Sequence, residues 1–379
     1  MEPIIDTQEF LALSSFLNYQ LSGEPVNWHG ILNLMTGKEY ARQDEEILLA
    51  ALSCLGAAYG DQKRRLGPFA ILHPIRAAAL LAKAQRRVDP LDLLSTLFHD
   101  KNEDLTAAGI EADRWREMER KYTGLLDLIG PQQAVQLEER LGALTKPEGQ
   151  KYYVYLGRLL QRSAANPELV TIKLADRLDN TLDLRIDLHD FTDNSRCYQV
   201  LFDVLFINTY KGFISDRPHP ISRKINGAMR LYQLYKNAVF LSLVRHQGVE
   251  LKADARRLFS SLAVASIREA QTILLHIFAY HLRSAAEQKE LLMDVMRYSE
   301  EGGFNQINTT GGHLLDGLFI RHFVFDGKEM KKDKLQALYD NKPLMGQSAL
   351  GFIIIFANFI NDERYLIRGI SPLGIESQD

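Results

Sequence analysis

Cysteine is scarce in this chain of 379 residues, since Cys54 and Cys197 are the two that occur. Two cysteines cannot build a disulfide framework or a cysteine-rich zinc site, so we expect a protein of a reducing compartment, the cytoplasm. The chain also has little excess of either charge, with a formal net charge of -3. This balance excludes a chain built as a whole to coat nucleic acid, but it leaves room for a local basic site that binds a small anion.

Long hydrophobic runs are missing as well. The most apolar run, Ala349 to Ile360, has about a dozen residues and is too short to span a bilayer. The first residues, Met1 to Phe16, lack the basic segment of a secretory signal. We therefore expect no membrane partner. The apolar content of 46% and the charged content of 25% are typical of a globular protein with a sizeable core.

Helical periodicity dominates the chain and predicts an all-α fold, in which any short hairpin is a minor feature. The prolines on both sides of His219 cannot continue a helix, so they mark a boundary at about 216 to 220. We divide the chain into an N-terminal extension, a catalytic domain and a helical C-terminal domain, at residues 1–44, 45–215 and 221–379. The helices expected in the last domain are about 223–246, 251–283, 286–299, 330–340 and 345–360.

A cluster of ionisable residues follows the helix that Asp89-Pro90 is expected to start. His99 and Asp100 come directly after its apolar residues, and Glu103 and Asp104 follow three positions later. Charged side chains next to a core must be paired or must bind a cation. An imidazole beside a carboxylate suits Mn, Fe, Zn or Mg. The cluster therefore predicts a metal site with carboxylates that can move a proton.

Two further positions can complete such a site. His73 lies at the start of a helix, before Pro74, and Asp176 lies in an apolar helix with Asn180 four residues later on the same face. With His99 and Asp100 they give two imidazoles and two carboxylates, which leave open positions on a metal ion for water or substrate. Each residue also has a simpler interpretation, since His73 suits a helix entrance and Asp176 could pair with Arg177.

The order of these motifs is similar to that of a known family. The motifs are Gln62-Lys63-Arg64-Arg65-Leu66-Gly67 with Ile71-Leu72-His73-Pro74, then His99-Asp100-x-x-Glu103-Asp104, then Lys173-Leu174-Ala175-Asp176-Arg177-Leu178-x-Asn180. Over residues 45 to 182 they resemble the HD-type hydrolase domain of the RelA/SpoT family, which degrades the alarmone (p)ppGpp of the stringent response. The resemblance implies an HD-domain helical bundle.

The resemblance also implies roles for single residues. It implies that Mn²⁺, or another divalent metal, is held by His73, His99, Asp100 and Asp176. It implies that Glu103 and Asp104 position and activate the attacking water and that Asn180 lies beside the metal and the nucleotide. Arg64 and Arg65, with the adjacent Lys63, match the basic loop that lines the nucleotide pocket. The reaction implied is hydrolysis of the 3'-pyrophosphate, giving GDP or GTP and pyrophosphate.

Departures from the family leave alternatives open. Lys101 and Asn102 are polar where the family carries apolar residues, Asp179 stands where it usually has histidine, and Leu66 replaces a small hydroxyl residue. Another nucleotide, or nucleotide binding with little turnover, is therefore a second interpretation. No segment resembles the family's synthetase domain. Residues 221–379 could regulate, bind a protein partner or self-associate.

Overall fold

The computed structural model describes residues 3–38, 40–62, 69–107, 109–184 and 226–375, and over these ranges the fold is all-α, as predicted. The strands of the described residues are β1 (Ile370–Ser371) and β2 (Gly374–Ile375), which pair as one short antiparallel hairpin. The predicted helix through 200–207, the boundary at 216–220 and the basic loop with Lys63, Arg64 and Arg65 lie outside the described residues.

The first half of the chain forms ten described helices. They are α1 (Thr7–Leu21), α2 (Trp28–Thr36), α3 (Arg42–Tyr59), α4 (Leu72–Ala84), α5 (Pro90–Leu97), α6 (Lys101–Asp104), α7 (Ala112–Ile129), α8 (Pro131–Leu144), α9 (Tyr152–Ser163) and α10 (Glu168–Asp183). The second half adds α12 (Gly227–His246), α13 (Ala253–Tyr280), α14 (Ala285–Glu300), the 3-10 helix η4 (Gly303–Gln306), α15 (Leu318–His322), α16 (Lys328–Asp340) and α17 (Lys342–Asn361).

Helix starts follow from local chemistry. The Asp89 side chain accepts a hydrogen bond from the Leu91 amide at 2.8 Å and Pro90 opens α5, so the predicted cap is confirmed. Asn226 caps α12 in the same way through the Met229 amide. The five C-terminal helices predicted from periodicity are all present, with ends shifted by a few residues.

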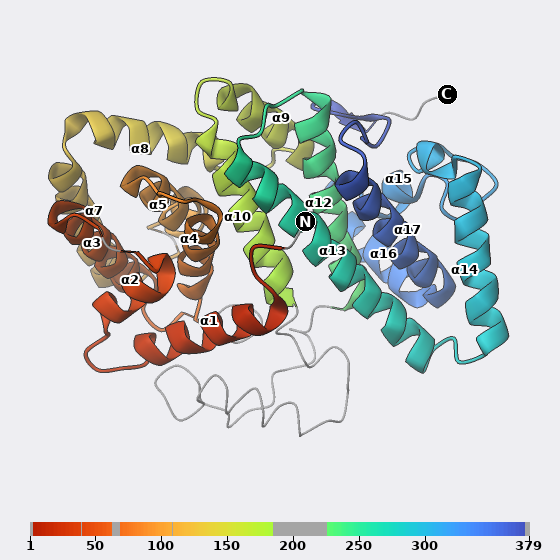
Figure 1. The fold of residues 1–379 in the computed structure, drawn as a ribbon, viewed down its shortest axis with the longest axis horizontal. Helices are drawn as coiled ribbons and strands as arrows, with labels where there is room; N and C mark the ends of the chain where they lie inside the picture. Colours follow the sequence, from red (N-terminus) through yellow and green to blue (C-terminus); the bar gives the residue numbers. More distant parts are fainter. Residues whose placement is uncertain (1–2, 39, 63–68, 108, 185–225, 376–379) are drawn as a thin grey trace.

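Helix α10 is the centre of the molecule. One side of α10 packs on α4 and the other side on α13, with α12 also in contact. Figure 1 shows α10 in the middle of the view, with α1 to α5, α7 and α8 on one side of it and α12 to α17 on the other. Helix α10 therefore contacts both halves, and both halves can position its side chains.

The hydrophobic core is continuous across the predicted segments. Phe10 and Leu17 of α1 are buried in the same cluster as Leu80 of α4, Leu174 of α10 and Phe352 of α17. The segment 1–44 thus packs onto the helices that follow it. The three-part division of the chain itself stays a prediction, because its main boundary falls outside the described residues.

Two helices pass a length and composition test for a membrane span. They are α13 and α17, whose most apolar windows are 50% and 61% buried inside the structure. The two helices pack along each other in the second half. A core helix of a globular protein satisfies the same test, so the expected absence of a membrane partner stays a prediction.

Candidate metal centre and active site

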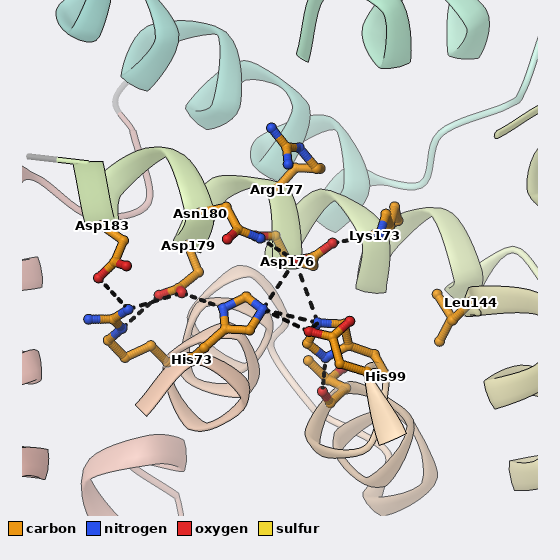
Figure 2. A network of polar contacts seen from close by, with 12 residues as sticks. His73, His99, Leu144, Lys173, Asp176, Arg177, Asp179, Asn180 and Asp183 are labelled. Atoms are coloured by element: carbon orange, nitrogen blue, oxygen red, sulfur yellow. Dashed lines mark hydrogen bonds and ion pairs between the residues drawn. The ribbon is translucent and has the colours of Figure 1, made fainter. Parts of the chain in front are cut away.

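Four predicted ligands converge on one point. The Nε2 atoms of His73 and His99 lie 3.2 Å apart. Asp100 Oδ2 lies 3.3 Å from His73 Nε2 and 3.1 Å from His99 Nε2. Asp176 Oδ1 lies 3.4 Å and 3.5 Å from the same two nitrogens. Figure 2 shows the two imidazoles facing each other with the Asp176 carboxylate beside them.

These separations fit a shared metal ion. Two donors that each bind an ion at about 2.1 Å are about 3.0 Å apart at a right angle and about 3.4 Å apart at the tetrahedral angle. The distances between these donors, 3.1 to 3.5 Å, lie close to this range. His73, His99 and Asp176 are buried, so few waters can replace a cation there. The four donors, which we call the donor cluster, can therefore hold one divalent ion.

The helices explain why these four side chains meet. His73 is in the first turn of α4, and Asp176 is in the middle of α10, which packs on α4. His99 and Asp100 lie in the link between α5 and α6, because α5 ends two residues before His99. Asp100 stands at the start of α6 but its side chain does not cap that helix, so its carboxylate points to the histidines instead.

A buried polar chain orients His73. Its Nδ1 lies 2.6 Å from Asp179 Oδ2. Arg76 donates to both oxygens of Asp179, at 2.8 Å and 3.2 Å, and to Asp183 at 2.7 Å. Since a carboxylate only accepts, His73 must carry its proton on Nδ1, and Nε2 then offers a lone pair to the donor cluster. Asp179 thus orients His73 toward the donor cluster.

The other donors are oriented in the same manner. His99 Nδ1 donates to the Thr96 carbonyl at 2.7 Å, which leaves Nε2 for the donor cluster. Asp176 Oδ2 pairs with Lys173 Nζ at 2.7 Å, and Asp176 Oδ1 accepts from the Asn180 amide at 2.6 Å. Asn180 therefore holds Asp176 in place beside the donor cluster.

Electrostatics keep the carboxylates ionised. Burial disfavours the charge of Asp176, but Lys173 and the two histidines outweigh it and hold the pKa of this carboxyl well below its usual value. Burial would lower the pKa of His99, but Asp100 and Asp176 raise it well above the usual value. The cluster thus concentrates negative charge around the imidazoles. A divalent cation would compete with protons for the imidazole nitrogens and carboxylate oxygens.

The donor cluster opens into a pocket of about 310 Å³. Glu103 and Asp104, the predicted acidic pair, line it together with His73, Asp100 and Asp176. Glu103 Oε1 also accepts from the Lys146 backbone amide at 2.6 Å, which fixes one of its oxygens. Burial against the pocket wall, followed by the charges of Asp100 and Glu103, raises the pKa of Asp104. A carboxylate with a raised pKa is a better proton acceptor for bound water.

The sequence did not identify the cations and aromatic rings of this pocket. The described cations are Lys146, Lys173, Arg177 and Lys236, and the described aromatic rings are Tyr59, Tyr152, Tyr155 and Tyr232. Lys173 and Arg177 belong to the Lys-Leu-Ala-Asp-Arg-Leu motif, so the sequence could have indicated that they lie near the site. No sequence motif indicated Lys236, since it comes from a helix beyond the predicted boundary. Cations and rings together suit a ligand that carries phosphate and an aromatic base.

Lys101 and Asn102, the two polar residues between Asp100 and Glu103, lie away from the pocket. Asn102 donates to the Thr145 hydroxyl at 3.2 Å, and Lys101 Nζ lies 4.1 Å from the centre of the Tyr122 ring. Neither residue lines the pocket. Arg177 does not pair with Asp176, as the simpler interpretation had it, because it donates to Asn237 Oδ1 at 3.0 Å and 2.6 Å. Figure 2 shows Arg177 directed away from the imidazoles, on the other side of α10.

Comparison with known proteins gives one similarity of limited extent. Over 124 residues the chain is 32% identical to a GTP pyrophosphokinase of Streptomyces coelicolor. The aligned part is 33% of this chain and 13% of that protein, so the chain spans a small share of its relative. No family model matches the chain, and no solved structure matches it. The chain is therefore similar, over a third of its length, to an enzyme named for a reaction on a guanine nucleotide.

Proposed function

We propose that this protein is a metal-dependent phosphohydrolase that removes the 3'-pyrophosphate of (p)ppGpp, giving GDP or GTP and pyrophosphate. One observation carries the proposal: the Nε2 atoms of two histidines lie 3.2 Å apart, and one oxygen each of Asp100 and Asp176 lies within 3.1 to 3.5 Å of both nitrogens, beside a basic, tyrosine-lined pocket. The scarcity of cysteine supports a cytoplasmic location.

The donor cluster fits a divalent ion with oxygen and nitrogen preference, for which we propose Mn²⁺. When bound, such an ion supplies a Lewis acid that polarises a phosphoryl oxygen and acidifies water. Lys173, Asn180 and Asp179 hold the donors in place through the hydrogen bonds described above. Metal loss is therefore expected to abolish turnover.

Glu103 and Asp104 supply the proton chemistry in this proposal. Asp104 has a raised pKa and faces the pocket, so it can accept the proton of the attacking water. Glu103 keeps one oxygen on the Lys146 amide and can orient the same water with the other. A protein that only binds a nucleotide has no need of such carboxylates, which favours an enzyme over a binding protein.

The substrate class follows from the pocket wall and from the relative. Lys146, Lys173 and Lys236 can bind phosphate oxygens, and the tyrosines can stack on a base. The similar protein is named for a reaction on GTP. Hydrolysis of another phosphorylated nucleotide is the alternative, because the basic loop at 63–65 lies outside the described residues.

The experiment is release of GDP and pyrophosphate from ppGpp by the purified protein with Mn²⁺. We expect turnover that EDTA removes and that Asp100→Ala abolishes, because this change deletes one donor. Asp113→Ala, which changes an exposed carboxylate that does not line the pocket, is the matched control and should keep full activity. If the metal-loaded protein binds one ion but leaves ppGpp intact, the alarmone assignment fails and other nucleotides must be tested.

A further inference from the structure

The pocket that contains the donor cluster is not built by the first half of the chain alone. Tyr232 and Lys236 of α12 line it, although they lie beyond the boundary expected from the sequence. The donors themselves come from α4, α10 and the link between α5 and α6. A ligand in this pocket therefore contacts both halves.

Lys236 has an unusual environment for a lysine. It is half-buried, and within the described ranges it forms no ion pair with a carboxylate. Burial lowers its pKa well below the usual value, and the nearby cations Arg177 and Lys331 lower it further. Lys173, on the same pocket, pairs instead with Asp176 at 2.7 Å. A partly desolvated ammonium group without a counterion destabilises the fold unless a ligand supplies the negative charge.

The position of Lys236 is fixed relative to the donor cluster. Arg177 and Asp176 are neighbours on α10, and Arg177 donates twice to Asn237, the residue after Lys236. Asn237 in turn donates to Thr181 at 2.8 Å and to Ser266 of α13 at 2.9 Å. This buried network ties the α12 segment with Lys236 to the helix that carries a metal ligand, so the lysine is preorganised.

The ring next to Lys236 completes a binding surface. Lys236 Nζ lies 5.3 Å from the centre of the Tyr232 ring, and Lys331 Nζ lies 4.5 Å from the same centre. Tyr232 is held by a stacked contact with Tyr235, with ring centres 6.0 Å apart. Cations beside an aromatic face suit a phosphate attached to a nucleoside.

We propose that Lys236 binds a second anionic group of the substrate, separate from the group that reaches the donor cluster, and so selects nucleotides with phosphates at two positions. This inference rests on the proposed function and assigns a substrate contact to the C-terminal half. Lys236 comes from α12, whereas the donors come from α4, α10 and the link between α5 and α6, so the pocket wall offers an anion a second contact beside the donor cluster. In a bisphosphorylated nucleotide the phosphate group that is not cleaved would occupy this place.

Binding of the two expected products, GDP and pyrophosphate, tests the two subsites one at a time and needs no turnover. We would measure the binding of GDP and of pyrophosphate to the Mn²⁺-loaded protein by calorimetry, in the wild type, in Lys236→Met and in the exposed control Lys289→Met. Lys236→Met should weaken GDP binding about 10- to 100-fold, as expected for loss of a charge-assisted hydrogen bond. Pyrophosphate and Mn²⁺ binding should change less than about twofold, because these ligands use the donor cluster. Lys289→Met should change nothing.

A second readout excludes misfolding. Removal of a partly buried ammonium group without a counterion should raise the melting temperature of the ligand-free protein in Lys236→Met. Unchanged GDP binding in this variant would overturn the inference, as would an equal loss of pyrophosphate and Mn²⁺ binding. Absence of ppGpp turnover in the wild type would refute the proposed function instead, and the GDP and pyrophosphate titrations would still decide the role of Lys236.

Discussion

Asp179 provides the sharpest test of how the donor cluster works. It lies 2.6 Å from His73 Nδ1 and accepts two hydrogen bonds from Arg76, and it does not face the pocket. Asp179→Asn keeps the size of the side chain but removes its charge. The amide can present either its oxygen or its NH₂ group to His73, so the imidazole loses the carboxylate that fixes its tautomer.

The expected magnitude follows from the loss of this partner. Loss of a carboxylate behind a ligating histidine reduces metal affinity about 10- to 100-fold, or about 1.4 to 2.7 kcal/mol. Stability should also fall by about 1.5 to 3 kcal/mol, because a charged hydrogen bond to buried Arg76 weakens. Mn²⁺ titration by calorimetry gives the first quantity, and urea unfolding of the metal-free protein gives the second.

Asp183→Asn is the matched control. Asp183 accepts from the same arginine at 2.7 Å and lies one turn of α10 beyond Asp179, the residue whose carboxylate contacts His73 Nδ1. It should therefore reduce stability to a similar extent and leave Mn²⁺ affinity within about threefold of the wild type. Equal Mn²⁺ affinities in Asp179→Asn and the wild type would refute the assignment of Asp179 as the residue that orients His73.

Three more predictions concern Asp104, the pH dependence of Mn²⁺ binding, and the contact between Arg177 and Asn237. Asp104→Asn should lower kcat for ppGpp at least about 100-fold at unchanged Mn²⁺ affinity. In the wild type, protonation of Asp104 should reduce kcat on the acid side of the pH profile, at a pH above the ordinary carboxyl pKa because the pKa of Asp104 is raised, and the variant should lose this decrease. A matching loss of bound metal would contradict this role. Mn²⁺ affinity should rise with pH up to the raised pKa of His99, since the ion must displace its proton, and calorimetry in buffers of different ionisation enthalpy should detect that proton. Asn237→Leu should lower the free energy of unfolding by about 1.5 to 3 kcal/mol in urea, because it leaves buried Arg177 with only the longer contacts to Gln233 at 3.4 Å, and unchanged stability would refute that role.

The four candidate donors could be predicted from the sequence because each has a local signal. His73 precedes a proline at a helix start, His99 and Asp100 follow an apolar run, and Asp176 lies in an apolar helix. Helical periodicity likewise predicted the all-α fold and the helices after 226, with errors at their ends where capping decides. In the structure the four donors converge, as their prediction as one set requires.

Contacts between distant segments had no comparable signal. Arg76 looks like an ordinary helix residue, and it becomes a partner of Asp179 only when α4 packs on α10. Asp176, Asp179 and Asp183 are spaced three and four residues apart, which places them on one face of a helix. This spacing could have indicated a cluster of buried carboxylates that needs a cationic partner such as Arg76. Lys236 reaches the pocket through the packing of α12 on α10, which periodicity does not encode.

Helix α10 carries Asp176 and Arg177 side by side, one for the donor cluster and one for the buried contact with α12. Adjacent side chains on a helix point about 100° apart, so neither can turn without turning the other. The two halves are therefore not interchangeable modules. A chimera that joins residues up to 184 to an unrelated C-terminal region would keep all four donor residues in its sequence and still lose their alignment, unless the new region also accepts the guanidinium of Arg177.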